Sequence, residues 1–112
     1  MIFTLIIRSH PLTDQGSQSA YHFAKALYSQ GHRIQCVFFY QNGIYHAQNY
    51  SLPADEPNIT QLWLQLAKEY DFELTACTTA CQKRGITNEH FPVAGLGQLS
   101  SSMLASERVI EF

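Results

Sequence analysis

The sequence has three cysteines, and two of them lie four residues apart in the stretch LTACTTACQKRG. These are Cys77 and Cys81, and they precede Lys83, Arg84 and Gly85. A cysteine thiolate can act as a nucleophile, carry a terminal sulfur atom as a persulfide, form a disulfide or ligate a metal. Free cysteine is also one of the most buried residue types. The chemistry of this stretch therefore depends on the elements that position the thiols.

Cys77 directly follows a predicted strand over 72–76 and begins a predicted short helix over 78–84. The free amide groups and the partial positive charge at a helix N-terminus favour thiolate over thiol. Thr78 and Thr79 can add hydroxyl donors, while Lys83 and Arg84 lie near the other end of the helix. Cys77 is therefore a candidate nucleophile or persulfide carrier. The alternative is a small buried residue at the end of a strand.

Cys81 comes one helical turn after Cys77, on about the same face, and three roles compete for it. A disulfide with Cys77 would make it a resolving thiol, but closure across one helical turn is strained. A zinc site would need His90 as the nearest further ligand, at a spacing that matches no common zinc pattern. We favour the third role, a half-buried packing residue. Cys36 lies inside an apolar strand pattern, which predicts a core position.

The histidines offer only weak candidates for acid–base chemistry. His10 and His46 belong to predicted loops at the edge of the site, where each can assist Cys77 or simply lie in a solvated loop. His22 and His32 are predicted to be at the surface. No histidine and carboxylate have the spacing that makes a hydrolase triad compelling, and no glycine-rich phosphate loop is present.

Short apolar runs alternate with helical patterns along the whole chain. The run IFTLII at 2–7 predicts a strand that is covered on both faces, and further strands are predicted at 34–40, 72–76 and 108–112. Helices are predicted at 17–30, from Pro57 and Asn58 onward, at 78–84 and at 96–104, whereas 41–57 and 86–95 are predicted to be irregular. The second helix has an apolar stripe at helical spacing: Ile59, Leu62, Trp63, Leu66 and Ala67.

This alternation predicts a single α/β domain over residues 1–112. We expect a parallel sheet of four to five strands with helices on both faces, in a flavodoxin-like layering. Sites in such folds form at the carboxyl ends of the strands. Ser9 and His10, residues 41–45 and Cys77 should therefore converge on one edge of the sheet.

The composition limits the possible functions. The chain has 112 residues, of which 46% are hydrophobic and 14% charged, so we expect a globular domain with apolar surface available for a subunit interface. The net charge of −2 and the lack of a basic block argue against direct nucleic-acid binding. The apolar run at the start is too short for a membrane span and lacks the features of a signal peptide. We expect a cytoplasmic protein without a disulfide framework.

Five segments of the chain form a recognisable set: IFTLIIRSHP, SQSAYHFAKALYSQGH, VFFYQNGIYHAQN, ACTTACQKRG and GLGQLSSSMLASERVIEF. Together they resemble the DsrE-like family. The resemblance covers most of the chain and is closest, within that family, to the sulfurtransferase subunit of the sulfur relay for tRNA 2-thiouridine. It implies the DsrE-like fold, and it implies that Cys77, which keeps the spacing to Gly85, is the sulfur-carrying residue.

The resemblance also implies partners. The cysteine of such a subunit accepts sulfane sulfur as a persulfide from a TusA-type carrier and passes it to a TusE- or DsrC-type acceptor, with no metal or organic cofactor. The subunit sits in a heterohexamer with homologous TusB- and TusC-like (DsrH- and DsrF-like) subunits. Two departures from the family pattern are a shorter segment between Ile86 and Gly95, and Cys81 where the family usually has a nonreactive residue.

Three other interpretations remain open. The first is a DsrE-type subunit in sulfur oxidation, with the same chemistry in another metabolic direction. The second is a noncatalytic assembly subunit of the same kind of hexamer, with Cys77 merely buried. The third is a dithiol redox protein that uses Cys77 and Cys81.

Overall fold

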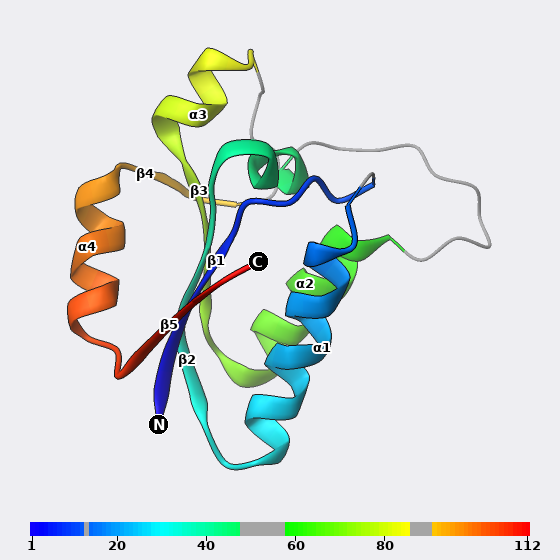
Figure 1. Ribbon diagram of the computed structural model, residues 1–112, viewed down its shortest axis with the longest axis vertical. Helices are drawn as coiled ribbons and strands as arrows, with labels where there is room; N and C mark the ends of the chain where they lie inside the picture. The colour runs from blue at the N-terminus through cyan, green and yellow to red at the C-terminus, as the bar shows by residue number, and fades with distance from the viewer. Residues whose placement is uncertain (13, 48–57, 86–90) are drawn as a thin grey trace.

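The computed structural model describes residues 1–12, 14–47, 58–85 and 91–112, and its centre is a five-stranded parallel sheet (Figure 1). The strand order is β4-β3-β2-β1-β5, and every neighbouring pair is parallel. The strands are β1 (Ile2–Ile7), β2 (Arg33–Phe39), β3 (Glu73–Cys77), β4 (Val93–Ala94) and β5 (Arg108–Glu111). The predicted fold class is confirmed.

Helices cover both faces of this sheet. The helices α1 (Gly16–Ser29) and α2 (Ile59–Tyr70) pack on one face, and α4 (Leu96–Leu104) packs on the other (Figure 1). The short helix α3 (Thr78–Lys83) extends from the carboxyl end of β3. Within the described part of the chain, no helix combines the length and the hydropathy needed to cross a bilayer.

The two segments predicted to be irregular contain regular structure. Residues 41–47 form the 3-10 helix η1 (Gln41–Ala47), which buries Ile44 completely. The two residues of β4 pair with Ala76 and Cys77 of β3. Neither element has a periodicity long enough to detect in the sequence, because β4 has 2 residues and η1 has 7. Residues 48–57 and 86–90 of these segments lie outside the described residues.

The core explains why the strand patterns are almost continuously apolar. Leu5 and Ile7 in β1, and Val37, Phe38 and Phe39 in β2, have no exposed surface, because helices cover both faces of the sheet. A parallel sheet of this kind buries successive side chains rather than alternate ones. The strand pattern of the sequence therefore has a direct structural cause.

The ends of the helices follow their local sequence. The side chain of Asn58 caps α2, because its Oδ1 accepts hydrogen bonds from the backbone N–H of Thr60 at 3.0 Å and of Gln61 at 3.3 Å. Gly31 and Gly85 follow α1 and α3 with φ angles of 82° and 63°, which is the left-handed conformation that glycine commonly adopts after a helix. Local sequence thus acts at the start of α2 and at the ends of α1 and α3, whereas no side chain caps the start of α3.

Candidate functional site

The carboxyl ends of β1 and β2 meet at one edge of the sheet, at the top of Figure 1. The backbone N–H of Tyr40, just after β2, donates to the carbonyl of Ile7 at 2.9 Å. A Cβ at Gly43 would lie 1.9 Å from that same carbonyl oxygen, so only glycine allows η1 to approach β1 this closely. The rings of His10 and Tyr45 lie 4.8 Å apart. The predicted convergence of these two loops is confirmed.

Cys77 lies at the same edge, as the last residue of β3 and the N-cap of α3. It borders a pocket of about 470 Å³. The pocket is formed by the end of β2, the start of η1, α3 and the start of α4, through Tyr40, Gln41, Cys77, Thr79, Ala80, Lys83, Arg84 and Leu96. The structure therefore brings Cys77 together with the loop after β2, as the sequence predicted.

Cys77 is only 1% exposed, which is the burial expected for the alternative of a small residue at the end of a strand. The reason is that β3 has a neighbouring strand on each side at this point. Ala76 pairs with Phe39 of β2, and Cys77 pairs with Ala94 of β4. The thiol forms part of the wall of the pocket, so a reagent must enter the pocket to reach it.

Lys83 and Arg84 are brought to the same pocket because α3 is short. The sequence placed these cations at the far end of the helix, but α3 has only 6 residues, so its far end is still beside Cys77. So short a helix contributes little dipole of its own, and the two side-chain charges are the stronger field. No acidic side chain is among the described residues that line the pocket. The charged side chains of the described lining are therefore both cations.

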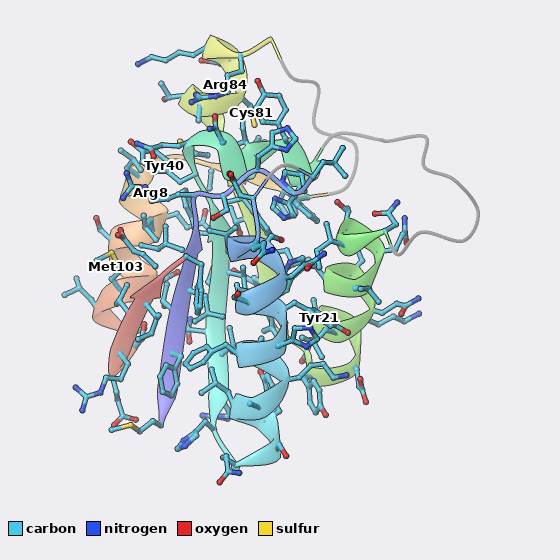
Figure 2. The ribbon with its side chains drawn as sticks, turned by 45° about the vertical axis from the view of Figure 1, so that its right-hand side comes forward. Arg8, Tyr21, Tyr40, Cys81, Arg84 and Met103 are labelled. Atoms are coloured by element: carbon cyan, nitrogen blue, oxygen red, sulfur yellow. The ribbon has the colours of Figure 1, made fainter. Side chains whose placement is uncertain are left out.

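Polar side chains of η1 hold two arginines at this edge. The Nη2 of Arg84 donates to Oδ1 of Asn42 at 3.4 Å, and the Nε of Arg8 donates to Oε1 of Gln41 at 2.8 Å. Arg8 also forms an exposed ion pair with Glu111 at 3.5 Å. Figure 2 shows Arg8, Tyr40 and Arg84 gathered at the end of the molecule where Cys81 also lies. The loop after β2 thus connects the basic residues of β1 and α3.

All three cysteines are free thiols. Cys81 is 5% exposed and thus more buried than the half-buried position we predicted. Burial raises the pKa of Cys81, and so does the neighbouring Cys77, whereas the positive charge of Arg84 lowers it. Cys36 is a core residue as predicted, and burial raises the pKa of its thiol to about 11. Its Sγ donates to Oγ1 of Thr75 at 3.8 Å.

His46 is fully buried, so the prediction of a solvated loop is wrong for this residue. Its Nδ1 donates to the carbonyl of Gly43 at 2.7 Å, and the hydroxyl of Ser17 donates to its Nε2 at 2.5 Å. The indole N–H of Trp63 donates in turn to the Ser17 oxygen at 3.4 Å. Burial lowers the pKa of His46 to about 4, so the ring is neutral at physiological pH. His46 therefore anchors η1 to α1, and it is not an acid or base for Cys77.

His10 is also absent from the lining of the Cys77 pocket. Its Nδ1 accepts a hydrogen bond from the backbone N–H of Leu12 at 3.1 Å, which holds the loop after β1. His22 is exposed as predicted, whereas the ring of His32 is partly covered and packs on Phe3. Among the described residues, no three histidine, cysteine or acidic side chains are grouped to hold a metal ion. The zinc hypothesis involved His90, which lies outside the described residues.

Three lining residues, Tyr40, Ala80 and Leu96, were not among the candidates from the sequence. Tyr40 had a usable signal, because it is the last residue of a strand predicted to end at the site, and Ala80 lies in the predicted helix after Cys77. Leu96 had none, because it reaches the pocket only through the pairing of β4 with β3. Sequence reasoning therefore missed the part of the site that depends on a long-range contact.

Known proteins are similar to this chain in sequence and in fold. The sulfurtransferase TusD homolog of Vibrio parahaemolyticus is 38% identical over 128 aligned positions that cover 100% of this chain and 98% of the relative. The sulfurtransferase TusD of Serratia proteamaculans is 34% identical over 98% of each chain. The putative sulfurtransferase DsrE of Allochromatium vinosum is 36% identical over 100% of this chain and 98% of its own. The crystal structure of the ychN protein from E. coli superposes with a TM-score of 0.81 at 19% identity and covers both chains completely.

The first of these alignments also bears on the length of the chain. It spans 128 positions, whereas this chain has 112 residues, so this chain is shorter than the relative within the aligned region. That the deletion falls between Ile86 and Gly95 stays a prediction. The model of the DsrE/DsrF-like family matches residues 1–112, which is the whole chain. Sequence match, full-length relatives and fold agree, and the chain belongs to the DsrE/DsrF-like family.

Proposed function

We propose that this protein is the sulfurtransferase subunit of a cytoplasmic sulfur relay and that Cys77 carries the sulfur as a persulfide. The donor is a TusA-type carrier, the acceptor is a TusE- or DsrC-type protein, and the sulfur is destined for tRNA 2-thiouridine. Homologous TusB- and TusC-like subunits complete a heterohexamer. The supporting relatives are named as sulfurtransferases, and they align over the full length of the chain.

The proposed reaction consists of two transfers of one neutral sulfur atom. In the first, the Cys77 thiolate attacks the terminal sulfur of the donor persulfide. The donor S–S bond breaks, a new S–S bond forms at Cys77, and the donor leaves as a thiolate. In the second, the acceptor thiolate attacks the terminal sulfur of the Cys77 persulfide, and Cys77 is the leaving thiolate. Each step conserves electrons, so no oxidant, metal or organic cofactor is required.

One observation carries the proposal: Cys77 lies at the carboxyl edge of the sheet, in a pocket whose charged side chains are both cations. A positive pocket favours the thiolate in the attack on the donor and again when Cys77 is the leaving group. The other thiols lack this setting, because Cys36 is in the core and Cys81 is absent from the pocket lining. Cys77 is thus the thiol best suited to the chemistry.

The test is sulfur uptake by the purified protein from a low-molecular-weight persulfide, followed by intact mass and peptide mass spectrometry. We expect one added sulfur atom on the Cys77 peptide, none in Cys77→Ser, and normal uptake in the matched control Cys81→Ser. Equal uptake by Cys77→Ser and the parent protein would remove Cys77 from the reaction. Restoration of tRNA 2-thiouridine in a relay-deficient strain by the parent protein, but not by Cys77→Ser, would identify the final acceptor.

Two observations support specific alternatives, and the same measurements separate them. The DsrE relative favours a sulfur-oxidation role, which predicts sulfur uptake by Cys77 without restoration of 2-thiouridine. The 1% exposure of Cys77 favours a noncatalytic assembly subunit, which predicts no uptake at any cysteine. A dithiol redox protein predicts a reversible disulfide between Cys77 and Cys81, seen as the loss of two hydrogens on mild oxidation.

A further inference from the structure

We propose that Arg84 binds the terminal sulfur of the Cys77 persulfide and that Asn42 positions its guanidinium for this contact. The inference rests on the proposed function, because it concerns the loaded form of Cys77. It assigns a substrate-binding role to one arginine of the pocket and a positioning role to one asparagine of η1.

The burial of Cys77 directs the added sulfur into the pocket. The residue is 1% exposed and forms part of the pocket wall. An S–S bond adds about 2 Å to the side chain, and the open volume beside the thiol is the pocket of about 470 Å³. The terminal sulfur of a persulfide carries negative charge in the reactive form. An anion in a partly enclosed pocket needs a cation or hydrogen-bond donors, because burial penalises an unpaired charge.

Arg84 is better placed for this than the other cations. Arg8 is already engaged by Gln41 and by Glu111 on the β5 side of the edge, and it is absent from the pocket lining. Lys83 lines the pocket but offers a single flexible ammonium. The planar guanidinium of Arg84 offers several N–H donors from one position, and only one of them contacts Asn42 in the described part of the chain.

The charge of Arg84 also acts on a thiol of α3, that of Cys81. It lowers the pKa of Cys81, the thiol that lies next to Cys77, against the opposing effects of burial and of Cys77. Figure 2 shows Arg84 directly beside Cys81, above Tyr40. A sulfur atom that extends from Cys77 into the pocket therefore enters the field of this guanidinium.

Asn42 accepts a hydrogen bond that orients the Arg84 side chain. The hydrogen bond from Nη2 to Oδ1 is long, at 3.4 Å, so it orients the guanidinium without holding it tightly. Asn42 belongs to η1. The following residue, Gly43, lies against the carbonyl of Ile7 and so fixes the backbone at this point. The arrangement leaves Arg84 free to turn toward an anion while it stays at the pocket.

The test uses three variants of the proposed contact: Arg84→Gln, Arg84→Lys and Asn42→Ala. Lys83→Gln is compared as the other cation of the pocket. Arg33→Gln is the matched control, because it removes an exposed cation near the amino end of β2. All are made in a Cys81→Ser background. The other titratable groups at the pocket are Tyr40, Lys83 and Cys77, with Arg8 and Glu111 beside it, and all of them are retained in Arg84→Gln. Each protein is loaded with sulfur, and the alkylation rate of the Cys77 persulfide is measured against pH. Arg84 and Asn42 are exposed, so we expect all variants to fold, which circular dichroism verifies.

We expect Arg84→Gln to shift the midpoint of the pH profile upward by about one unit and to slow sulfur transfer to an acceptor thiol about tenfold. Arg84→Lys should recover part of both effects, Asn42→Ala should show a smaller shift in the same direction, and Arg33→Gln should show none. The assignment to Arg84 is overturned if the pH profile of Arg84→Gln equals that of the parent, or if Lys83→Gln shifts the profile more than Arg84→Gln does. If Cys77 still takes up sulfur normally in these variants, the proposed function stands. An unchanged Asn42→Ala profile overturns the positioning role alone. If the parent protein takes up no sulfur at Cys77, both proposals fail.

Discussion

At the scale of single residues, the structure separates titratable groups that look alike in sequence. His10 and His46 both follow strands and both appeared able to assist Cys77. The His46 ring bridges Gly43 and Ser17 inside the molecule, whereas His10 accepts a hydrogen bond within its own loop. Neither lines the pocket of Cys77. The charged side chains that line the pocket of Cys77 belong to Lys83 and Arg84, and in the proposed reaction they take the place of a histidine base.

The buried His46 makes stability depend on pH. Its pKa is lowered to about 4 in the folded protein from 6.5, so the unfolded chain binds more protons between these values. The contribution of this group is complete above pH 6.5 and is lost as the pH falls from 6.5 toward about 4, up to about 3 kcal/mol. Urea unfolding from pH 7 to 4 should show this loss. In His46→Gln the slope over this range should be smaller, whereas exposed His22→Gln should keep the parent slope. Equal slopes in parent and His46→Gln would contradict it.

At the scale of elements, the site depends on how closely η1 approaches the end of β1. Gly43 and the Ile7 carbonyl are in direct contact, and Tyr40 donates its N–H to the same carbonyl. This contact places Gln41 and Asn42 beside the basic side chains of β1 and α3. The short α3 completes the arrangement, because its far end remains at the pocket of its own N-cap cysteine.

Gly43→Ala should therefore disturb both the stability and the site. The new methyl group would lie 1.9 Å from a backbone oxygen that cannot move without the strand, so we expect a loss of about 1–3 kcal/mol in unfolding free energy. Displacement of η1 should also lower the rate of sulfur uptake by Cys77. Gly97→Ala is the matched control, since a Cβ there meets no atom within 4 Å and the residue is inside α4. Unchanged stability in Gly43→Ala, measured by urea unfolding, would contradict the close approach.

At the scale of the whole molecule, one core joins the two helices of one face to the sheet. Trp63 of α2 has no exposed surface, and its ring packs edge-on against Tyr21 of α1 at 5.6 Å and Phe39 of β2 at 6.1 Å. Its indole N–H reaches Ser17 and thus the His46 network. Of the described helices, α4 covers the opposite face. It buries Leu99, whereas Leu96, Met103 and Leu104 are exposed, Leu104 at 89%. Apolar surface of this kind supports the proposed assembly with homologous subunits.

Trp63→Ala should lower the unfolding free energy of the whole protein by about 3–5 kcal/mol, because it removes the largest buried side chain and leaves a cavity between three elements. The midpoint of a urea or thermal transition measures this. Gln65→Ala, an exposed change on the same helix, should stay within about 0.5 kcal/mol of the parent. A Trp63→Ala loss no larger than that of Gln65→Ala would show that this ring does not join the elements.

The sequence alone determined strands β1, β2, β3 and β5, the four α-helices and the parallel arrangement of the sheet. Apolar runs, the Asn58 cap and the glycines after α1 and α3 act within a few residues, so they predicted the strands, the helices and the edge at which Cys77 lies. The tertiary structure decided what pairs across the chain: β4 beside β3, the burial of His46 and Cys77, and the meeting of Lys83 and Arg84 with the loop after β2. These features have no local signal, because burial and charge proximity depend on which distant segments a residue meets after the chain has folded.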